Sequence, residues 1–175
     1  MSLLTPERIS LAISLLQSLD LKTMLHSAFQ SESKSKETGE TKLGITLKGL
    51  SSMHNPSSTS ILYAPPLPSK PLEDFCKALK DVFLSEGLLV VEDRELLLHA
   101  TVLNTVYVKG GRRGGGGHGK RKARLTVDAS ALLAEWTGFV WCEGAVERVA
   151  VCRMGAEKDG DGEVAYGEVG SVALP

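Results

Sequence analysis

Residues 96–107 read Leu-Leu-Leu-His-Ala-Thr-Val-Leu-Asn-Thr-Val-Tyr, a run dominated by aliphatic and β-branched side chains. Such a run predicts a β-strand, which we expect to extend to residue 108. Because side chains alternate between the two faces of a strand, His99 and Thr101 are expected to share one face with Leu103 and Thr105. An imidazole and a hydroxyl placed in this way can bind the same phosphate group.

The pair His99 and Thr101 has the form H-x-T and suits phosphoester chemistry. A histidine can take up and release a proton near neutral pH, and a threonine hydroxyl can donate a hydrogen bond to a phosphoryl oxygen. A single histidine in a strand is more often structural, however, so the tripeptide needs support from the rest of the chain.

Local patterns on both sides of this strand predict an α+β fold with an antiparallel sheet and two main helices on its faces. Thr5, Pro6 and Glu7 form a helix start, and the helix is expected to reach residue 29 with a break near Asp20. A second helix is expected from Pro71 to Gly87, and a short one, capped by Asp128 or Ser130, is expected to end at Trp136. Strands are expected over residues 42–50, 60–64, 88–91, 146–154 and 163–172, the first two forming a hairpin.

Length and composition describe one domain over residues 1–175, with a polar loop at residues 31–41. Cys76, Cys142 and Cys152 form no C-x-x-C pair, which favours free thiols in a reducing compartment, the nucleus or the cytoplasm. No apolar run approaches the roughly 18 residues of a membrane span, so we expect no membrane partner.

Positive charge is concentrated in residues 109–124, a segment rich in Gly, Arg and Lys that we expect to be a flexible insertion. It holds seven of the 20 basic residues and no acidic one, while the rest of the chain holds the other 13 and all 21 acidic residues. Such a segment can contact a nucleic-acid backbone without sequence selectivity. The alternatives are a solvated insertion or a nuclear-localisation signal at residues 120–122. The candidate nucleic-acid-binding residues are Arg112, Arg113, Lys120, Arg121, Lys122 and Arg124.

The run 96–107 resembles the second H-x-T strand of the A-kinase anchor protein 7-like phosphoesterase domain. This domain is the 2'-5' RNA ligase-like form of the two-histidine phosphoesterases, found also in activating signal cointegrator 1 complex subunit 1. Residues 47–56, 61–64, 87–88 and 148–155 match in the same order. The resemblance implies His99 and Thr101 as catalytic residues. It also implies acid–base chemistry, with no metal and no cofactor, on an RNA or nucleotide phosphodiester such as a 2',3'-cyclic phosphate or a 2'-5' bond.

The chain departs from this family pattern in one respect, because the family has two facing H-x-[ST] motifs. His26-Ser27-Ala28 and His54-Asn55-Pro56 do not fit that form, which leaves only His99-Ala100-Thr101. In the family the first motif precedes a helix that begins much like residues 4–7, so we expect the fold to be N-terminally incomplete. Losing one acid–base partner costs about 10²- to 10⁴-fold in rate, so we expect an inactive phosphoesterase-like domain. The alternative is a non-catalytic RNA-binding or scaffold subunit of a transcription coactivator or repair complex, and enzyme activity stays open.

Overall fold

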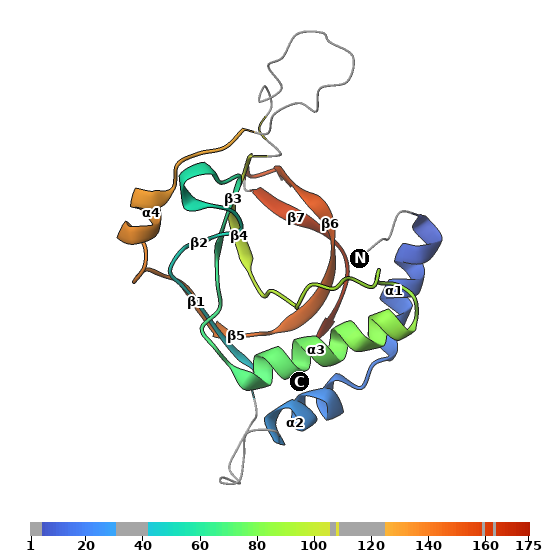
Figure 1. The fold of residues 1–175 in the computed structure, drawn as a ribbon. Helices are drawn as coiled ribbons and strands as arrows, with labels where there is room; N and C mark the ends of the chain where they lie inside the picture. Colours follow the sequence, from blue (N-terminus) through green and yellow to red (C-terminus); the bar gives the residue numbers. More distant parts are fainter. Residues whose placement is uncertain (1–4, 31–41, 106–107, 109–124, 159, 163) are drawn as a thin grey trace. The chain divides into compact units, whose positions relative to one another are not determined.

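A computed structural model describes residues 5–30, 42–105, 108, 125–158, 160–162 and 164–175 (Figure 1). The contacts within the chain divide it into two compact units. The first unit comprises Met1–Gly44, Pro68–Leu96 and Gly144–Pro175, and the second comprises Ile45–Leu67 and Leu97–Glu143. Both the expected polar loop at residues 31–41 and the insertion at 109–124 lie outside the described residues. The prediction of a single domain stays a prediction.

The expected N-terminal helix is two helices, α1 (Pro6–Ser18) and α2 (Leu21–Gln30). The Thr5 side chain accepts a hydrogen bond from the Arg8 amide and caps α1. The carboxylate of Asp20 accepts hydrogen bonds from the Thr23 hydroxyl (2.7 Å) and the Thr23 amide (3.0 Å), and these bonds hold the pKa of Asp20 below its usual value. The break near Asp20 is therefore confirmed, because Asp20 caps a new helix there.

The helix expected over residues 71–87 is α3 (Lys70–Ser85). The Ser69 hydroxyl accepts from the Leu72 amide, and Gly87, with φ of 66°, ends the helix in the left-handed region. Phe75 and Phe83 are buried on its apolar face. In the part of the chain that the structure describes, no helix combines the length and the hydropathy of a membrane span.

The core of the first unit lies where helices α1 and α3 meet an antiparallel pair, β6 (Arg148–Lys158) and β7 (Val164–Ala173) (Figure 1). Its buried members are Ala12, Leu16, Phe83, Leu88 and Val151. Helix α1 approaches β7 closely at Gly170, where an added Cβ atom would lie 2.9 Å from Ile13 Cγ1.

The second unit holds a three-stranded antiparallel sheet of β2 (Ser51–Ser52), β3 (Ile61–Ala64) and β4 (Ala100–Asn104). A 3₁₀ turn, η1 (Pro56–Ser58), links β2 to β3. Strand β1 (Gly44–Lys48) pairs with β5 (Val140–Ala145), and Leu47 also bridges Pro66. The predicted pairing of residues 42–50 with 60–64 is therefore not observed as expected, because β3 pairs with β2 and β1 reaches this segment only through the Leu47–Pro66 bridge. Strand β5 is one that the sequence analysis did not predict.

The short helix of the second unit is α4 (Ser130–Glu135). Neither expected residue is the N-cap, which is Ala129 and has no side-chain hydrogen bond. Asp128 lies just before it and accepts a hydrogen bond at Oδ1 from the Ser130 amide at 2.9 Å. The hydrogen bond from the Ser130 amide has the largest effect on the pKa of Asp128, and the Ser130 side chain has a smaller one. Both lower that pKa. The α+β prediction with antiparallel sheets is confirmed, although the described residues form three sheets and four α-helices.

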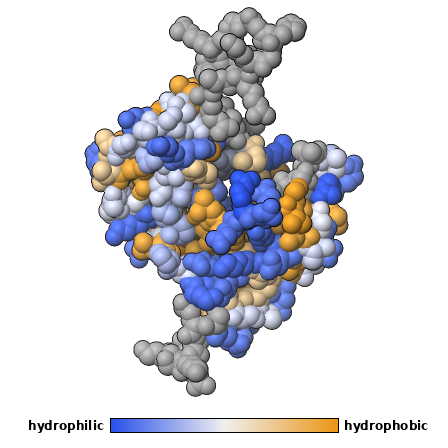
Figure 2. Space-filling view, viewed as in Figure 1, coloured by the Kyte–Doolittle hydropathy of each residue, from blue (hydrophilic) through white to orange (hydrophobic). Residues whose placement is uncertain are grey.

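Two predicted strands differ from the observed ones. Residues 88–91 form no strand. Among the described residues of the strand expected over 96–108, only β4 is a strand, so His99 lies just before it and not within it. The Leu88 amide bonds the Phe83 carbonyl at the end of α3, and Leu88 is buried there, whereas Val90 and Val91 are 62% and 77% exposed. Figure 2 shows hydrophobic residues in separate patches among hydrophilic ones on the viewed face. Aliphatic composition alone does not make a strand, because a strand needs a partner for its backbone hydrogen bonds.

Gly49 provides a stability prediction for the second unit. Its φ is 75°, and an added Cβ atom would lie 2.9 Å from the Thr137 carbonyl oxygen. Gly49→Ala is expected to lower the free energy of unfolding by about 3 kcal/mol, because left-handed strain adds to a clash with backbone. Gly87→Ala is the matched control, since Gly87 also has positive φ but has open space around it, and it is expected to cost about 1 kcal/mol. Equal losses in urea unfolding would show that the contact with Thr137 is unimportant.

Candidate functional site

Strand β4 carries a β-bulge beside the H-x-T motif. Ala64 pairs with Ala100 and Tyr63 with Thr101, after which the register shifts by one residue, so that Leu62 pairs with Leu103 and Ile61 with Asn104. Val102 is the extra residue in β4. Bulges reverse the alternation of side chains and are frequent next to active sites.

The bulge corrects the predicted faces of this strand. His99 and Thr101 are both exposed, as expected for side chains that meet a ligand. Leu103 instead lies opposite the buried Leu62, and Thr105 is only 6% exposed, its hydroxyl donating to the Leu125 carbonyl at 2.6 Å. The prediction that Leu103 and Thr105 share the face of His99 and Thr101 is therefore wrong.

The imidazole of His99 is held by two contacts. Its Nδ1 lies 2.9 Å from the Leu97 carbonyl oxygen. Because a carbonyl oxygen can only accept, we assign the proton to Nδ1, which leaves Nε2 of the neutral ring as a free acceptor. The Tyr63 ring meets the His99 ring in a T-shaped arrangement with centroids 5.7 Å apart. The arrangement suits a base at Nε2 and a hydrogen-bond donor at the Thr101 hydroxyl.

Two residues of this sheet face were missed by the sequence analysis. Ser51 pairs with Tyr63, and Tyr63 pairs with Thr101, so the three side chains form one row across β2, β3 and β4. The strand predicted over residues 60–64 was the one indication of this face in the sequence. It contained Tyr63, but no sequence pattern showed which residues of other strands would pair with it. Figure 1 shows the three strands side by side.

The other described histidines form no second H-x-[ST] site. His54 is exposed in the turn after β2, with its Nδ1 3.5 Å from the Ser60 hydroxyl oxygen. His26 is exposed on α2, with its Nε2 2.7 Å from Gln30 Nε2. The six candidate nucleic-acid-binding residues, Arg112, Arg113, Lys120, Arg121, Lys122 and Arg124, lie outside the described residues. Within the described ranges, no group of three or more His, Cys, Asp or Glu side chains is placed to hold a metal ion.

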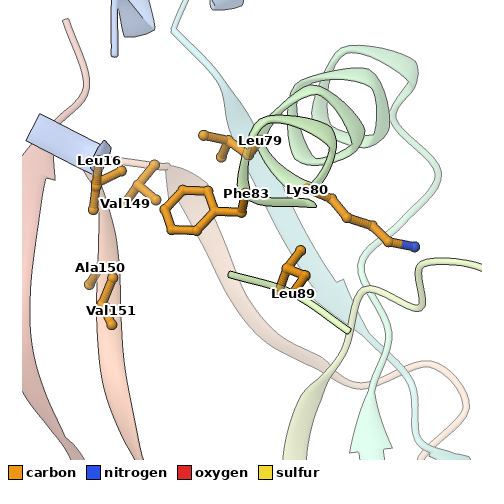
Figure 3. Close-up of a pocket in the computed structure, with 8 residues that line it drawn as sticks. All are labelled: Leu16, Leu79, Lys80, Phe83, Leu89, Val149, Ala150 and Val151. Carbon is orange, nitrogen blue, oxygen red and sulfur yellow. The ribbon is translucent and has the colours of Figure 1, made fainter. Parts of the chain in front are cut away.

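An apolar cavity of about 160 Å³ lies in the first unit (Figure 3). Helices α1 and α3 and strand β6 contribute most of its lining, which includes neither His99 nor Thr101. Its one charged lining residue, Lys80, points its amino group away from the cavity. This cavity therefore offers no group for phosphoester chemistry, and phosphate binding at His99 and Thr101 stays a prediction.

Three aromatic rings join α4 to β5 in the second unit. Trp136 and Trp141 stack with centroids 5.3 Å apart, and Phe139 meets both rings edge-on. Trp141 Nε1 donates to the Gly49 carbonyl at 2.7 Å, so the rings also fix the interruption between β1 and β2. We interpret this cluster as a structural support for the strand that leads to Ser51.

Comparison with known proteins identifies the domain. A family model described as the AKAP7 2'5' RNA ligase-like domain matches residues 1–174. An uncharacterized protein of Schizosaccharomyces pombe is 27% identical over 141 residues, which cover 79% of this chain and 62% of that protein. The chain thus spans less than two thirds of the length of this relative. Specific similarity to the cointegrator complex subunit stays a prediction. The chain belongs to the AKAP7 2'5' RNA ligase-like domain family, as the residues around its H-x-T strand indicated.

Proposed function

We propose that this chain binds an RNA or nucleotide phosphodiester at His99 and Thr101, and that these 175 residues do not turn it over. The observation that carries the proposal is the exposed H-x-T pair next to a β-bulge, with Nδ1 of His99 committed to the Leu97 carbonyl. Nε2 of His99 and the hydroxyl of Thr101 are then available to one phosphoryl group.

Hydrolysis of a 2',3'-cyclic phosphate needs two proton transfers. Water attacks phosphorus as a base removes its proton, and the bond from phosphorus to one ribose oxygen breaks as an acid protonates that oxygen. His99 can serve as the base, and Thr101 can donate to a non-bridging oxygen. No second H-x-[ST] motif in these residues provides the acid. Because general acid–base catalysis contributes about 10²- to 10⁴-fold for each group, binding without rapid turnover is the expected result.

Binding and turnover of 2',3'-cyclic AMP test this proposal. We expect NMR titration to detect binding, and the product assay to detect no hydrolysis. His99→Ala and Thr101→Ala are each expected to weaken binding about tenfold, because a hydrogen bond to a charged group contributes about 1.5–3 kcal/mol. His54→Ala is the matched control within the same unit and should leave affinity unchanged. Hydrolysis that disappears in His99→Ala would show that one motif suffices, and unchanged affinity in both site variants would place the ligand elsewhere.

The concentration of positive charge in one segment supports a second candidate function. This function is a non-catalytic RNA-binding or scaffold subunit of a transcription coactivator or repair complex. Residues 109–124 hold seven basic residues and no acidic one, in a chain of net charge −1. Counterion release from RNA would make such binding strong at low salt and insensitive to sequence. The three described thiols are free, in keeping with the nucleus or the cytoplasm.

A further inference from the structure

The row of Ser51, Tyr63 and Thr101 extends the His99 site across the sheet. The three residues are direct neighbours in the registers of β2, β3 and β4, so their side chains lie on one face. Adjacent strands are about 4.8 Å apart, so the row spans about 10 Å. His99 and Thr101 can hold a phosphate at one end of the row, which leaves Tyr63 and Ser51 for the group attached to that phosphate.

The hydroxyls of this row have no hydrogen-bond partners in the described part of the chain, unlike their neighbours. Ser52 donates to Thr59 at 2.6 Å, and Ser58 donates to Thr126 at 3.1 Å. Ser51 and Tyr63 are half-buried, and Thr101 is exposed. The Tyr63 ring meets the His99 ring in a T-shaped contact, and because Tyr63 is only half-buried it keeps surface for another contact. The three hydroxyls on one sheet face are therefore accessible and can bond a polar ligand.

We propose that Tyr63 and Ser51 form the nucleoside subsite of this phosphodiester site. The ring of Tyr63 stacks against the base next to the phosphate, and the Ser51 hydroxyl bonds a polar atom of the same nucleoside. Aromatic side chains recognise unpaired bases in this way, because every base offers a π face. The inference rests on the proposed function, since His99 and Thr101 define the phosphate end of the row.

Two probes separate the subsite from the phosphate site, 2',3'-cyclic AMP and inorganic phosphate. By NMR titration, Tyr63→Leu is expected to weaken binding of 2',3'-cyclic AMP about tenfold and to change binding of phosphate less than twofold. Tyr63→Phe keeps the ring and is expected to retain most of the affinity for 2',3'-cyclic AMP that Tyr63→Leu loses. Ser51→Ala is expected to weaken only 2',3'-cyclic AMP, by about threefold. Tyr166→Leu is the matched control. Tyr166 lies on β7, outside this sheet, and is 42% exposed.

The outcomes distinguish the two proposals. An unchanged affinity of Tyr63→Leu for 2',3'-cyclic AMP overturns the subsite while leaving the proposed function intact. An equal loss for both probes also overturns it, since Tyr63 would then act through His99. A loss in Tyr63→Leu without any loss in His99→Ala would overturn both proposals, because the subsite is defined by the phosphate that His99 and Thr101 hold. If Tyr63→Leu does not fold, the Ser51→Ala result decides, and equal affinity to wild type would overturn the subsite.

Discussion

Phe83→Ala is expected to lower the free energy of unfolding by about 3–5 kcal/mol. Phe83 is 6% exposed in the core of the first unit, together with Ala12, Leu16, Leu88 and Val151. It also borders the apolar cavity of about 160 Å³, so removing the phenyl ring enlarges an existing void. The cost of a truncation grows with the cavity that it leaves. Urea unfolding followed by circular dichroism measures the loss.

The control for Phe83 is an apolar side chain of α1 that is largely in solvent. Leu11 is 54% exposed, so Leu11→Ala is expected to cost less than about 0.5 kcal/mol. Phe83→Leu retains part of the side chain and should fall between the two. A loss below about 1.5 kcal/mol in Phe83→Ala would mean that the surrounding side chains collapse into the space and that the cavity is not rigid.

Removing the positive charge of residues 109–124 is expected to flatten the salt dependence of binding to single-stranded RNA. The variant replaces Arg112, Arg113, Lys120, Arg121, Lys122 and Arg124 with alanine. Each lost phosphate contact removes about 0.7 from the slope of log K against log salt, so the slope should fall by up to about 4. Between 50 and 200 mM salt, the wild type should then lose up to about 250-fold more affinity than the variant. Titrations with an unstructured RNA at these two salt concentrations measure the difference.

A variant of equal charge provides the control for this experiment. It replaces six exposed basic residues from other parts of the chain, Lys22, Lys77, Arg94, Arg148, Arg153 and Lys158, with alanine. Both variants lower the net charge by six, so an equal change of slope would indicate a general effect of charge. An unchanged slope in the variant of residues 109–124 would make that segment a solvated insertion. His99→Ala is expected to leave the slope unchanged, because it removes no fixed positive charge.

Helices could be predicted because their signals lie within a few residues of one another. Thr5 bonds the amide of Arg8, Asp20 bonds that of Thr23, and Ser69 bonds that of Leu72. Each cap reaches three residues along the chain, a distance that the sequence displays directly. The break near Asp20 and the end of α3 before Gly87 could be predicted for the same reason.

Only part of the candidate site could be predicted from the sequence. His99 and Thr101 stand two residues apart in a recognisable motif, although only Thr101 lies in β4 and His99 immediately precedes that strand. Ser51 and Tyr63 join them through a register across three strands, although 50 residues separate Ser51 from Thr101. No local pattern encodes that register.

The sequence by itself determined the helices, the H-x-T pair and the membership in the family. Only the tertiary structure decided that residues 88–91 form no strand, that β5 pairs with β1, and that Val102 forms a bulge. Helical hydrogen bonds join residues four apart, whereas a strand depends on a partner from elsewhere in the chain. A one-residue shift in that partnership turns every following side chain to the other face, which is why Thr105 is buried although it follows Thr101 by an even number of residues.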